Sequence, residues 1–304
     1  MRACRALEGY DVIGEAVVHG AGTIVNAIAC GKGSAFGINL WTKARVELTD
    51  EAGVIEGKIL SDPGEDTGLI KAAVRNVLER FIALDYGARV VTESNIPISR
   101  GLKSSSAAAN AVVLATLAAL GKKLGDVEAV LLGVEAAIAA GVTVTGAFDD
   151  ACASYFGGVV VTDNVKRSIL RMEPFTEEFK VVILVPPTKI RKREINLRRV
   201  KSLSGIVEVA LELAMRGDYL KAMTLNGLAY SASLGLSSDA AVRALEAGAA
   251  AAGLSGTGPA VIALTPPEKV DDVVDAWNQF EGEVVLAGVS NEKAKITVWG
   301  GVSC

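Results

Sequence analysis

The segment at residues 97–110 constrains this chain more than any other stretch. Its sequence, PISRGLKSSSAAAN, places a proline-led turn and a glycine before three serines, and a run of strong helix formers follows to about Gly121. Amide N–H groups in the first turn of a helix lack partners within the helix, and the helix dipole adds partial positive charge there, so the pattern favours binding of an anion such as phosphate. A capped helix after a turn would show the same pattern, because serine is also a good N-cap.

Two common nucleotide-binding motifs are absent. A phosphate-binding P-loop needs a glycine, four residues and then Gly-Lys-Ser or Gly-Lys-Thr, whereas the nearest approach has Asn26 in the first position and Gly33 in place of the hydroxyl. Gly31, Gly33 and Gly37 are wrongly spaced for the dinucleotide fingerprint GxGxxG. The sequence therefore disfavours an ordinary P-loop kinase and lacks the dinucleotide-binding fingerprint.

Hydrophobic periodicity predicts a mixture of strands and helices in both halves of the chain, which is typical of an α+β fold. The predicted strands lie near residues 14–18, 36–48, 88–93, 179–185, 260–264, 283–289 and 294–298. The predicted helices lie at residues 67–84, 106–120, 126–140, 206–216, 219–232, 240–252 and 267–280. A chain of 304 residues suits two domains of ordinary size, and we place them at residues 1–168 and 169–304.

Composition narrows the class of partner. A formal net charge of -4 argues against nucleic-acid binding, which needs a broad basic surface, so a small molecule is the expected partner. No apolar run is long enough for a membrane span and the N-terminus lacks a signal-peptide pattern, so we expect a cytoplasmic protein with no membrane partner. The cysteines follow neither a zinc pattern nor a disulfide pattern.

Three separated segments resemble the motifs of the GHMP kinase superfamily, which includes galactokinase, homoserine kinase and mevalonate kinase. They are residues 21–37 (AGTIVNAIACGKGSAFG), the serine-rich segment at residues 97–107 and residues 254–260 (LSGTGPA). Lys103 and Ser106 depart from the superfamily pattern Pro-x-x-x-Gly-Leu-Gly-Ser-Ser-Ala, since they replace its second glycine and an alanine. These departures, together with ACGKGSAFGI, resemble the archaeal shikimate kinase family in particular, over essentially the whole chain.

The resemblance implies a ribosomal-S5-like N-terminal domain, a ferredoxin-like C-terminal domain, and transfer of the γ-phosphoryl group of ATP to the 3-hydroxyl of shikimate with Mg²⁺ as cofactor. It implies that ATP binds at the serine-rich segment, whose residues are Pro97, Ile98, Ser99, Arg100, Gly101, Leu102, Lys103, Ser104, Ser105, Ser106 and Ala107. Ser105 and Glu135 are implied as the magnesium ligands, and the ammonium of Lys103 can neutralise phosphate charge.

The catalytic aspartate is implied to lie in the segment at residues 145–158. Counting forward from Gly146, as in galactokinase, selects Asp149, whereas counting back from Gly157-Gly158, as in mevalonate kinase, selects Asp150. Either carboxylate could accept or orient the proton of the acceptor hydroxyl. Two acidic residues at the start of a helix could also serve only to cap it, and the sequence leaves the choice open.

The acceptor site is implied at positions spread over the chain. The residues implied to bind substrate are Asn26, Lys32, Ser34, Arg191, Gly256 and Gly258. An arginine can clamp the carboxylate of shikimate in two parallel hydrogen bonds, and Arg191 competes for that role with Arg193, Arg198 and Arg199.

Two other functions fit the same motifs. One is a GHMP kinase for a different acceptor, such as homoserine or mevalonate, and the other is a nucleotide sensor without catalytic activity. Lys103 and the Gly31-Lys32-Gly33-Ser34 segment disfavour the first, and the aspartates and serines disfavour the second. The oligomeric state stays open.

Overall fold

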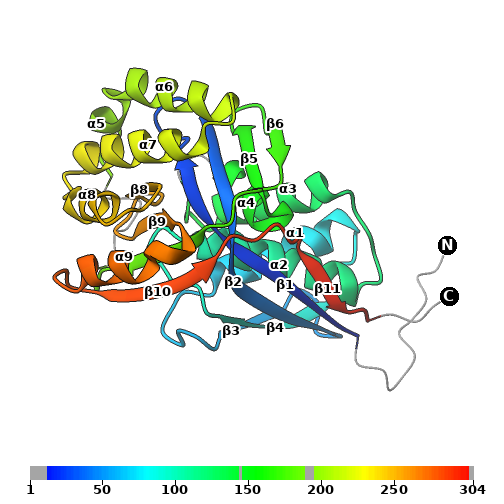
Figure 1. The fold of residues 1–304 in the computed structure, drawn as a ribbon. Coiled ribbons are helices and arrows are strands. Elements are labelled where there is room, and N and C mark those ends of the chain that lie inside the picture. The colour runs from blue at the N-terminus through cyan, green and yellow to red at the C-terminus, as the bar shows by residue number, and fades with distance from the viewer. Residues whose placement is uncertain (1–11, 144–145, 189–194, 301–304) are drawn as a thin grey trace.

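Two sheets with helices packed around them make up the α+β fold of this chain (Figure 1). The structure is a computed structural model, which describes residues 12–143, 146–188 and 195–300. The expected α+β class is confirmed.

The first sheet is built on a long antiparallel hairpin. Strand β1 (Ile13–Val25) turns at residues 26–31 and returns as β2 (Lys32–Thr49), and the sheet continues in the order β11 (Lys295–Val298), β1, β2, β4 (Gly87–Ser94), β3 (Ile55–Ile59). The pairing of β1 with β2 shifts register between His19 and Gly20, and the two ends of β2 pair with different strands on the other side. Its C-terminal part pairs with β4, and its N-terminal part pairs with β5 (Val159–Asp163), which in turn pairs with β6 (Ser168–Glu173).

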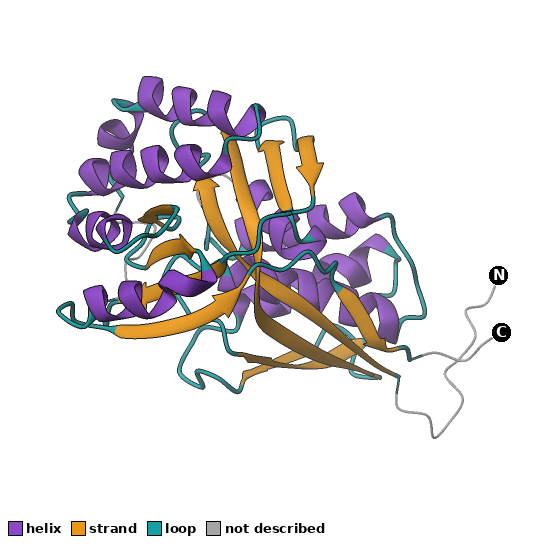
Figure 2. Ribbon diagram, viewed as in Figure 1, coloured by secondary structure: helices purple, strands orange, loops and turns teal. Residues whose placement is uncertain are grey.

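Helix α2 (Ser104–Ala119) packs on this sheet in the centre of the molecule (Figure 2). Alanines allow its backbone to approach β1 so closely that a Cβ at Gly14 would collide with the Ala115 carbonyl oxygen. Helices α1 (Gly68–Arg80), α3 (Asp126–Ala139) and α4 (Phe148–Phe156) pack against α2. The N-terminus of α2 is therefore held rigidly at one end of the sheet.

The second sheet has the antiparallel order β10 (Glu283–Gly288), β7 (Lys180–Val185), β9 (Val261–Thr265), β8 (Ala251–Leu254). Helix α7 (Tyr219–Leu234) packs on β8 through two glycines, since a Cβ at Gly227 would collide with the Gly253 backbone. The remaining elements of this half are α5 (Leu197–Lys201), α6 (Ser204–Met215), α8 (Asp239–Glu246), a short 3-10 helix (Pro267–Lys269) and α9 (Val270–Trp277).

One predicted helix is wrong in its second half. The alanine-rich residues 240–252 were expected to form one helix, but α8 ends at Glu246 and strand β8 begins at Ala251. Gly248 has a φ of +102°, which breaks the helix, and pairing of β8 with β9 outweighs the helical propensity of alanine.

The domain boundary after residue 168 stays a prediction. The sheets themselves are not divided at that point, because β6 crosses it, β11 lies C-terminal to it, and both strands belong to the first sheet. Among the described helices, none combines the length and the apolar character needed to cross a membrane.

Candidate functional site

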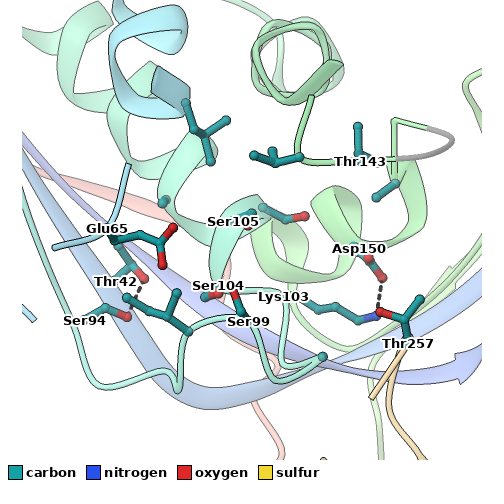
Figure 3. Close-up of a pocket in the computed structure, with 18 of the residues that line it drawn as sticks. Thr42, Glu65, Ser94, Ser99, Lys103, Ser104, Ser105, Thr143, Asp150 and Thr257 are labelled. Atoms are coloured by element: carbon teal, nitrogen blue, oxygen red, sulfur yellow. Dashed lines mark hydrogen bonds and ion pairs between the residues drawn. The ribbon is translucent and has the colours of Figure 1, made fainter. Parts of the chain in front are cut away.

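A cavity of about 760 Å³ lies where the two halves of the fold meet. Its walls include the start of α2, the turn after β1, the start of α4, the loop at residues 256–258 and the loop between β3 and α1 (Figure 3). The sequence motifs at residues 26–28, 98–106, 149–150 and 256–258 thus meet around one space.

We call residues 97–106 the serine loop. Ser104 is the first residue of α2, no side chain caps this helix and no acidic residue lies in its first turn, so the helix start is open to an anion. Seven of the residues predicted to bind ATP line the cavity: Ile98, Ser99, Gly101, Lys103, Ser104, Ser105 and Ser106. Leu102 and Ala107 are instead fully buried in the core, and Pro97 is not among the residues that line the cavity.

Hydrogen bonds hold the serine loop against the second half of the chain. Ser255 Oγ donates to the Gly101 carbonyl oxygen over 2.8 Å, and the Ala260 amide donates to the Arg100 carbonyl oxygen over 3.1 Å. Gly101 has a φ of +88°, and a Cβ there would collide with the Ser255 carbonyl oxygen. Position 101 therefore requires a glycine, both for its backbone conformation and for its close approach to Ser255.

Arg100 does not contribute to the cavity wall. Its Nη2 donates to the Pro187 carbonyl oxygen over 2.7 Å, beyond the end of β7. The guanidinium thus links the serine loop to the second sheet instead of lining the space where an anion would bind.

Lys103 occupies a backbone conformation that favours glycine. It precedes α2 with a φ of +64°, and its Nζ lies 2.9 Å from Asp150 Oδ1 of α4. The side chains of Lys103 and Asp150 are only 6% and 12% exposed, so this ion pair is largely shielded from water. Gly256 makes room for it, because a Cβ there would lie 2.9 Å from Nζ.

Asp149 has a different environment from Asp150. Its Oδ1 accepts a hydrogen bond from Asn164 Nδ2 over 2.8 Å, and a Cβ on Gly33 would collide with its Oδ2. Burial, and then the neighbouring charge of Asp150, raise the pKa of Asp149 to about 7, whereas Lys103 and Asn164 act in the opposite direction. The two adjacent aspartates therefore have different partners, Asn164 for Asp149 and Lys103 for Asp150.

The turn after β1 is held in place by residues far away in the sequence. Asn26 Nδ2 donates to the Gly256 carbonyl oxygen over 2.9 Å, and the Asn26 amide donates to Asn226 Oδ1 over 3.0 Å. Tyr230 Oη donates to the Asn26 carbonyl oxygen and accepts from the Ala29 amide. This network gives residues 26–28 a fixed position beside the aspartates, and we call these residues together with the first turn of α4 the aspartate wall.

Comparison with known proteins assigns the family. The sequence profile of the GHMP kinases N terminal domain matches residues 68–158, and that of the GHMP kinases C terminal domain matches residues 210–282. The shikimate kinase of Methanothrix thermoacetophila is 51% identical over 283 residues, which cover 93% of this chain and 96% of that protein. The chain belongs to the GHMP kinase family.

Further relatives point to the same branch of these kinases. The shikimate kinase of Methanosarcina acetivorans is 48% identical over 92% of this chain and 95% of its own length, and that of Pyrococcus furiosus is 44% identical over 87% and 94%. Within the GHMP kinases, this chain is a member of the archaeal shikimate kinase family.

Solved structures confirm the GHMP fold. The mevalonate kinase of Methanococcus jannaschii superposes with a TM-score of 0.75 over 93% of this chain and 100% of that one, at 16% identity. The homoserine kinase of Cytophaga hutchinsonii has a TM-score of 0.73 over 97% and 100%, at 19% identity.

Three further residues with expected roles do not line the cavity of this kinase. Glu135 lies on the exposed face of α3, where its Oε1 pairs with Arg167 Nη1 at 3.3 Å, because the opposite face of the helix packs on α2. Lys32 is exposed and lies outside the cavity lining, and Ser34 is fully buried within β2. A fourth residue, Arg191, lies outside the described residues, as does its competitor Arg193.

The other two competing arginines are described and lie on α5. Arg199 donates from Nη2 to the Ala232 carbonyl oxygen over 2.8 Å, and neither Arg198 nor Arg199 lines the cavity. Asn26, Gly256 and Gly258 do line the cavity, as expected of substrate-binding residues.

Sequence reasoning missed two features of the site. One is the loop between β3 and α1, from which Glu65 faces the hydrogen-bonded pair Thr42 and Ser94 (Figure 3). The other is Asn164, which follows β5 and does not line the cavity itself but bonds to Asp149, which does. No motif marks either part, but a strand predicted after Gly157-Gly158 would have brought Asn164 close to the aspartates.

Proposed function

We propose that this chain transfers the γ-phosphoryl group of ATP to the 3-hydroxyl of shikimate in the cytoplasm. The observation that carries the proposal is that one cavity joins an open helix start, a buried ammonium and two carboxylates in a chain 51% identical to a shikimate kinase. Phosphoryl transfer depends mainly on positioning and charge neutralisation, which these groups can supply.

The serine loop is the proposed phosphate site. Ser104, Ser105 and Ser106 line the cavity at the positive end of the α2 dipole, where amide groups and hydroxyls can donate to phosphate oxygens. The ammonium of Lys103, which belongs to this loop, pairs with Asp150, and it can neutralise the charge that develops on the transferred group.

Asp150 is the proposed partner of the acceptor hydroxyl. Its carboxylate lines the cavity and pairs with Lys103, which belongs to the serine loop, so it lies next to the group that would face the γ-phosphate. In the transfer, the acceptor oxygen forms a bond to the γ-phosphorus while the bond from that phosphorus to the bridging oxygen breaks. ADP leaves, and the hydroxyl proton passes to the Asp150 carboxylate.

The residues around the serine loop suit a magnesium ion held mainly by phosphate and water. Mg²⁺ takes oxygen ligands and usually keeps several waters, and the Ser105 hydroxyl lines the cavity at the start of α2. Within the described ranges, no cluster of three or more His, Cys, Asp or Glu could bind a metal, and Glu135 lies outside the cavity lining. Ser105 would therefore hold the ion together with the phosphates, and the ion would neutralise phosphate charge.

A panel of acceptors tests the proposal. Purified protein with ATP and MgCl₂ should release ADP when shikimate is added, and mass spectrometry should find a shikimate monophosphate. Homoserine and mevalonate should give background rates. Phosphorylation of homoserine or mevalonate but not of shikimate would overturn the assignment, and ATP binding without acceptor-stimulated ADP release would indicate a nucleotide sensor.

A further inference from the structure

Asn164 connects the two parts of the aspartate wall. It is 5% exposed and follows strand β5. Its main-chain amide donates to the Gly31 carbonyl oxygen over 2.9 Å, in the turn that joins β1 to β2. Its side chain reaches the first turn of α4, where Nδ2 donates to Asp149 Oδ1 and Oδ1 accepts from the Asp149 amide over 3.2 Å. One residue thus bonds both to the hairpin turn and to the helix that carries the aspartates.

The orientation of the Asn164 amide is fixed by a third partner. Thr162 Oγ1 donates to Asn164 Oδ1 over 2.7 Å, which leaves Nδ2 to face the carboxyl group of Asp149. The other carboxyl oxygen of Asp149 packs on Gly33 at the start of β2, where a Cβ would collide with it. The Asp149 carboxyl group is therefore enclosed by the hairpin on one side and by Asn164 on the other.

Asp150, in contrast, pairs with Lys103 of the serine loop. We propose that the two aspartates have separate roles, in which Asp149 and Asn164 form one positioning unit that holds the hairpin turn against α4 for acceptor binding, and Asp150 contacts the acceptor. This inference rests on the proposed function only for the identity of the acceptor.

Asn110 offers a matched control. It is also a buried asparagine that bonds to α4, since its Nδ2 donates to the Ala151 carbonyl oxygen over 2.9 Å and to Ser154 Oγ over 3.2 Å. These contacts lie further along the helix, and Asn110 does not line the cavity. Loss of either asparagine removes hydrogen bonds to the same helix, but of the two only Asn164 bonds to an aspartate.

The test compares Asn164→Ala with Asn110→Ala in the full chain. We expect Asn164→Ala to raise both the KM for shikimate and its calorimetric Kd by about tenfold, with the KM for ATP changed less than about twofold. Asn110→Ala should lower thermal stability without changing the KM or the Kd for shikimate. Equal shikimate affinity in the two variants would overturn the proposal.

Exchange of the side chains at positions 149 and 164 distinguishes a positioning role of Asp149 from a catalytic role. Asn164→Asp places a carboxylate against Asp149 and should weaken shikimate binding, whereas the double variant Asp149→Asn/Asn164→Asp restores an amide facing a carboxylate and should recover most of the KM and kcat. If the double variant binds shikimate normally but does not turn over, Asp149 takes part in the chemistry and the proposal is wrong.

Hydrogen exchange in the substrate-free protein tests the positioning unit whatever the acceptor is. Asn164→Ala should speed hydrogen exchange at the Asp149 amide, which Asn164 holds, whereas Asn110→Ala should leave that amide unchanged. If wild-type protein does not phosphorylate shikimate, the proposed function fails, but this exchange pattern still supports or refutes the positioning unit. Equal exchange at Asp149 in both variants would refute it.

Discussion

The serine loop forms within a single stretch of ten residues, whereas the aspartate wall is assembled from segments more than 100 residues apart. In the serine loop, a turn, Gly101 and the start of α2 follow one another directly along the chain. In the aspartate wall, Asn26 is fixed by Asn226 and Gly256, and Asp149 is fixed by Asn164. The first can be recognised as a motif, and the second depends on how the chain folds back on itself.

The Lys103–Asp150 ion pair is the point at which the two regions meet. Lys103 belongs to the serine loop and Asp150 to the aspartate wall, and their side chains are both largely buried. Variants that separate the two regions at this pair should therefore have the largest effects on turnover.

Asp150→Asn should have the largest effect, because it removes the carboxylate that we propose contacts the acceptor and leaves the Lys103 ammonium without its partner. We expect kcat to fall by at least about 100-fold, with a smaller change in the KM for ATP. Steady-state kinetics with shikimate and ATP would measure both. A near-normal kcat would make Asp150 a capping residue and return the catalytic role to Asp149.

Replacement of Lys103 separates its charge from its backbone conformation. Lys103→Gly and Lys103→Met both remove the ammonium, and we expect each to lower kcat by about tenfold or more. Only glycine relieves the left-handed conformation at φ +64°, so Lys103→Gly should be more stable than Lys103→Met by about 1 kcal/mol. Urea unfolding of the two variants measures this difference, and equal stabilities would contradict a conformational cost at position 103.

Arg100→Ala should affect the serine loop alone. The variant loses the hydrogen bond from Nη2 to the Pro187 carbonyl oxygen, so the loop is held less firmly and the KM for ATP should rise by roughly threefold to tenfold. The KM for shikimate should change little, and Arg100→Lys should restore part of the loss. Arg80→Ala is a matched control, because Arg80 pairs with Glu128 on the surface. A larger rise in the KM for shikimate than in the KM for ATP would contradict the expectation that Arg100 supports only the serine loop.

Asp149 should make the free energy of unfolding depend on pH. Its pKa is raised to about 7 in the folded chain, above the ordinary value of 3.8, mainly by burial and the charge of Asp150. The folded state then holds this proton more tightly than the unfolded state. The resulting contribution to the free energy of unfolding is fully present below pH 4 and is lost as the pH rises through about 7.

Asp149→Asn removes this ionisation. The free energy of unfolding should therefore fall less between pH 5 and pH 8 in the variant than in wild-type protein, as measured by urea unfolding at both values. Parallel curves for the two proteins would show that Asp149 has an ordinary proton affinity in the fold.

Sequence reasoning succeeded where the signal is local. The serine loop, the start of α2 and most strands follow from turn residues, helix formers and periodicity over short windows. It failed at Glu135, since a lone acid in an alanine-rich helix does not indicate which face packs on α2. It also gave Arg100 the same role as its neighbours in the loop, although its side chain turns to Pro187.

The sequence by itself determined the family, the serine loop and the presence of two candidate aspartates, because these depend on residues that are adjacent in the chain. Only the tertiary structure paired Lys103 with Asp150 and Asp149 with Asn164. The physical reason is that burial and long-range hydrogen bonds give adjacent residues different partners. Two aspartates that are equivalent in the sequence thereby acquire different environments.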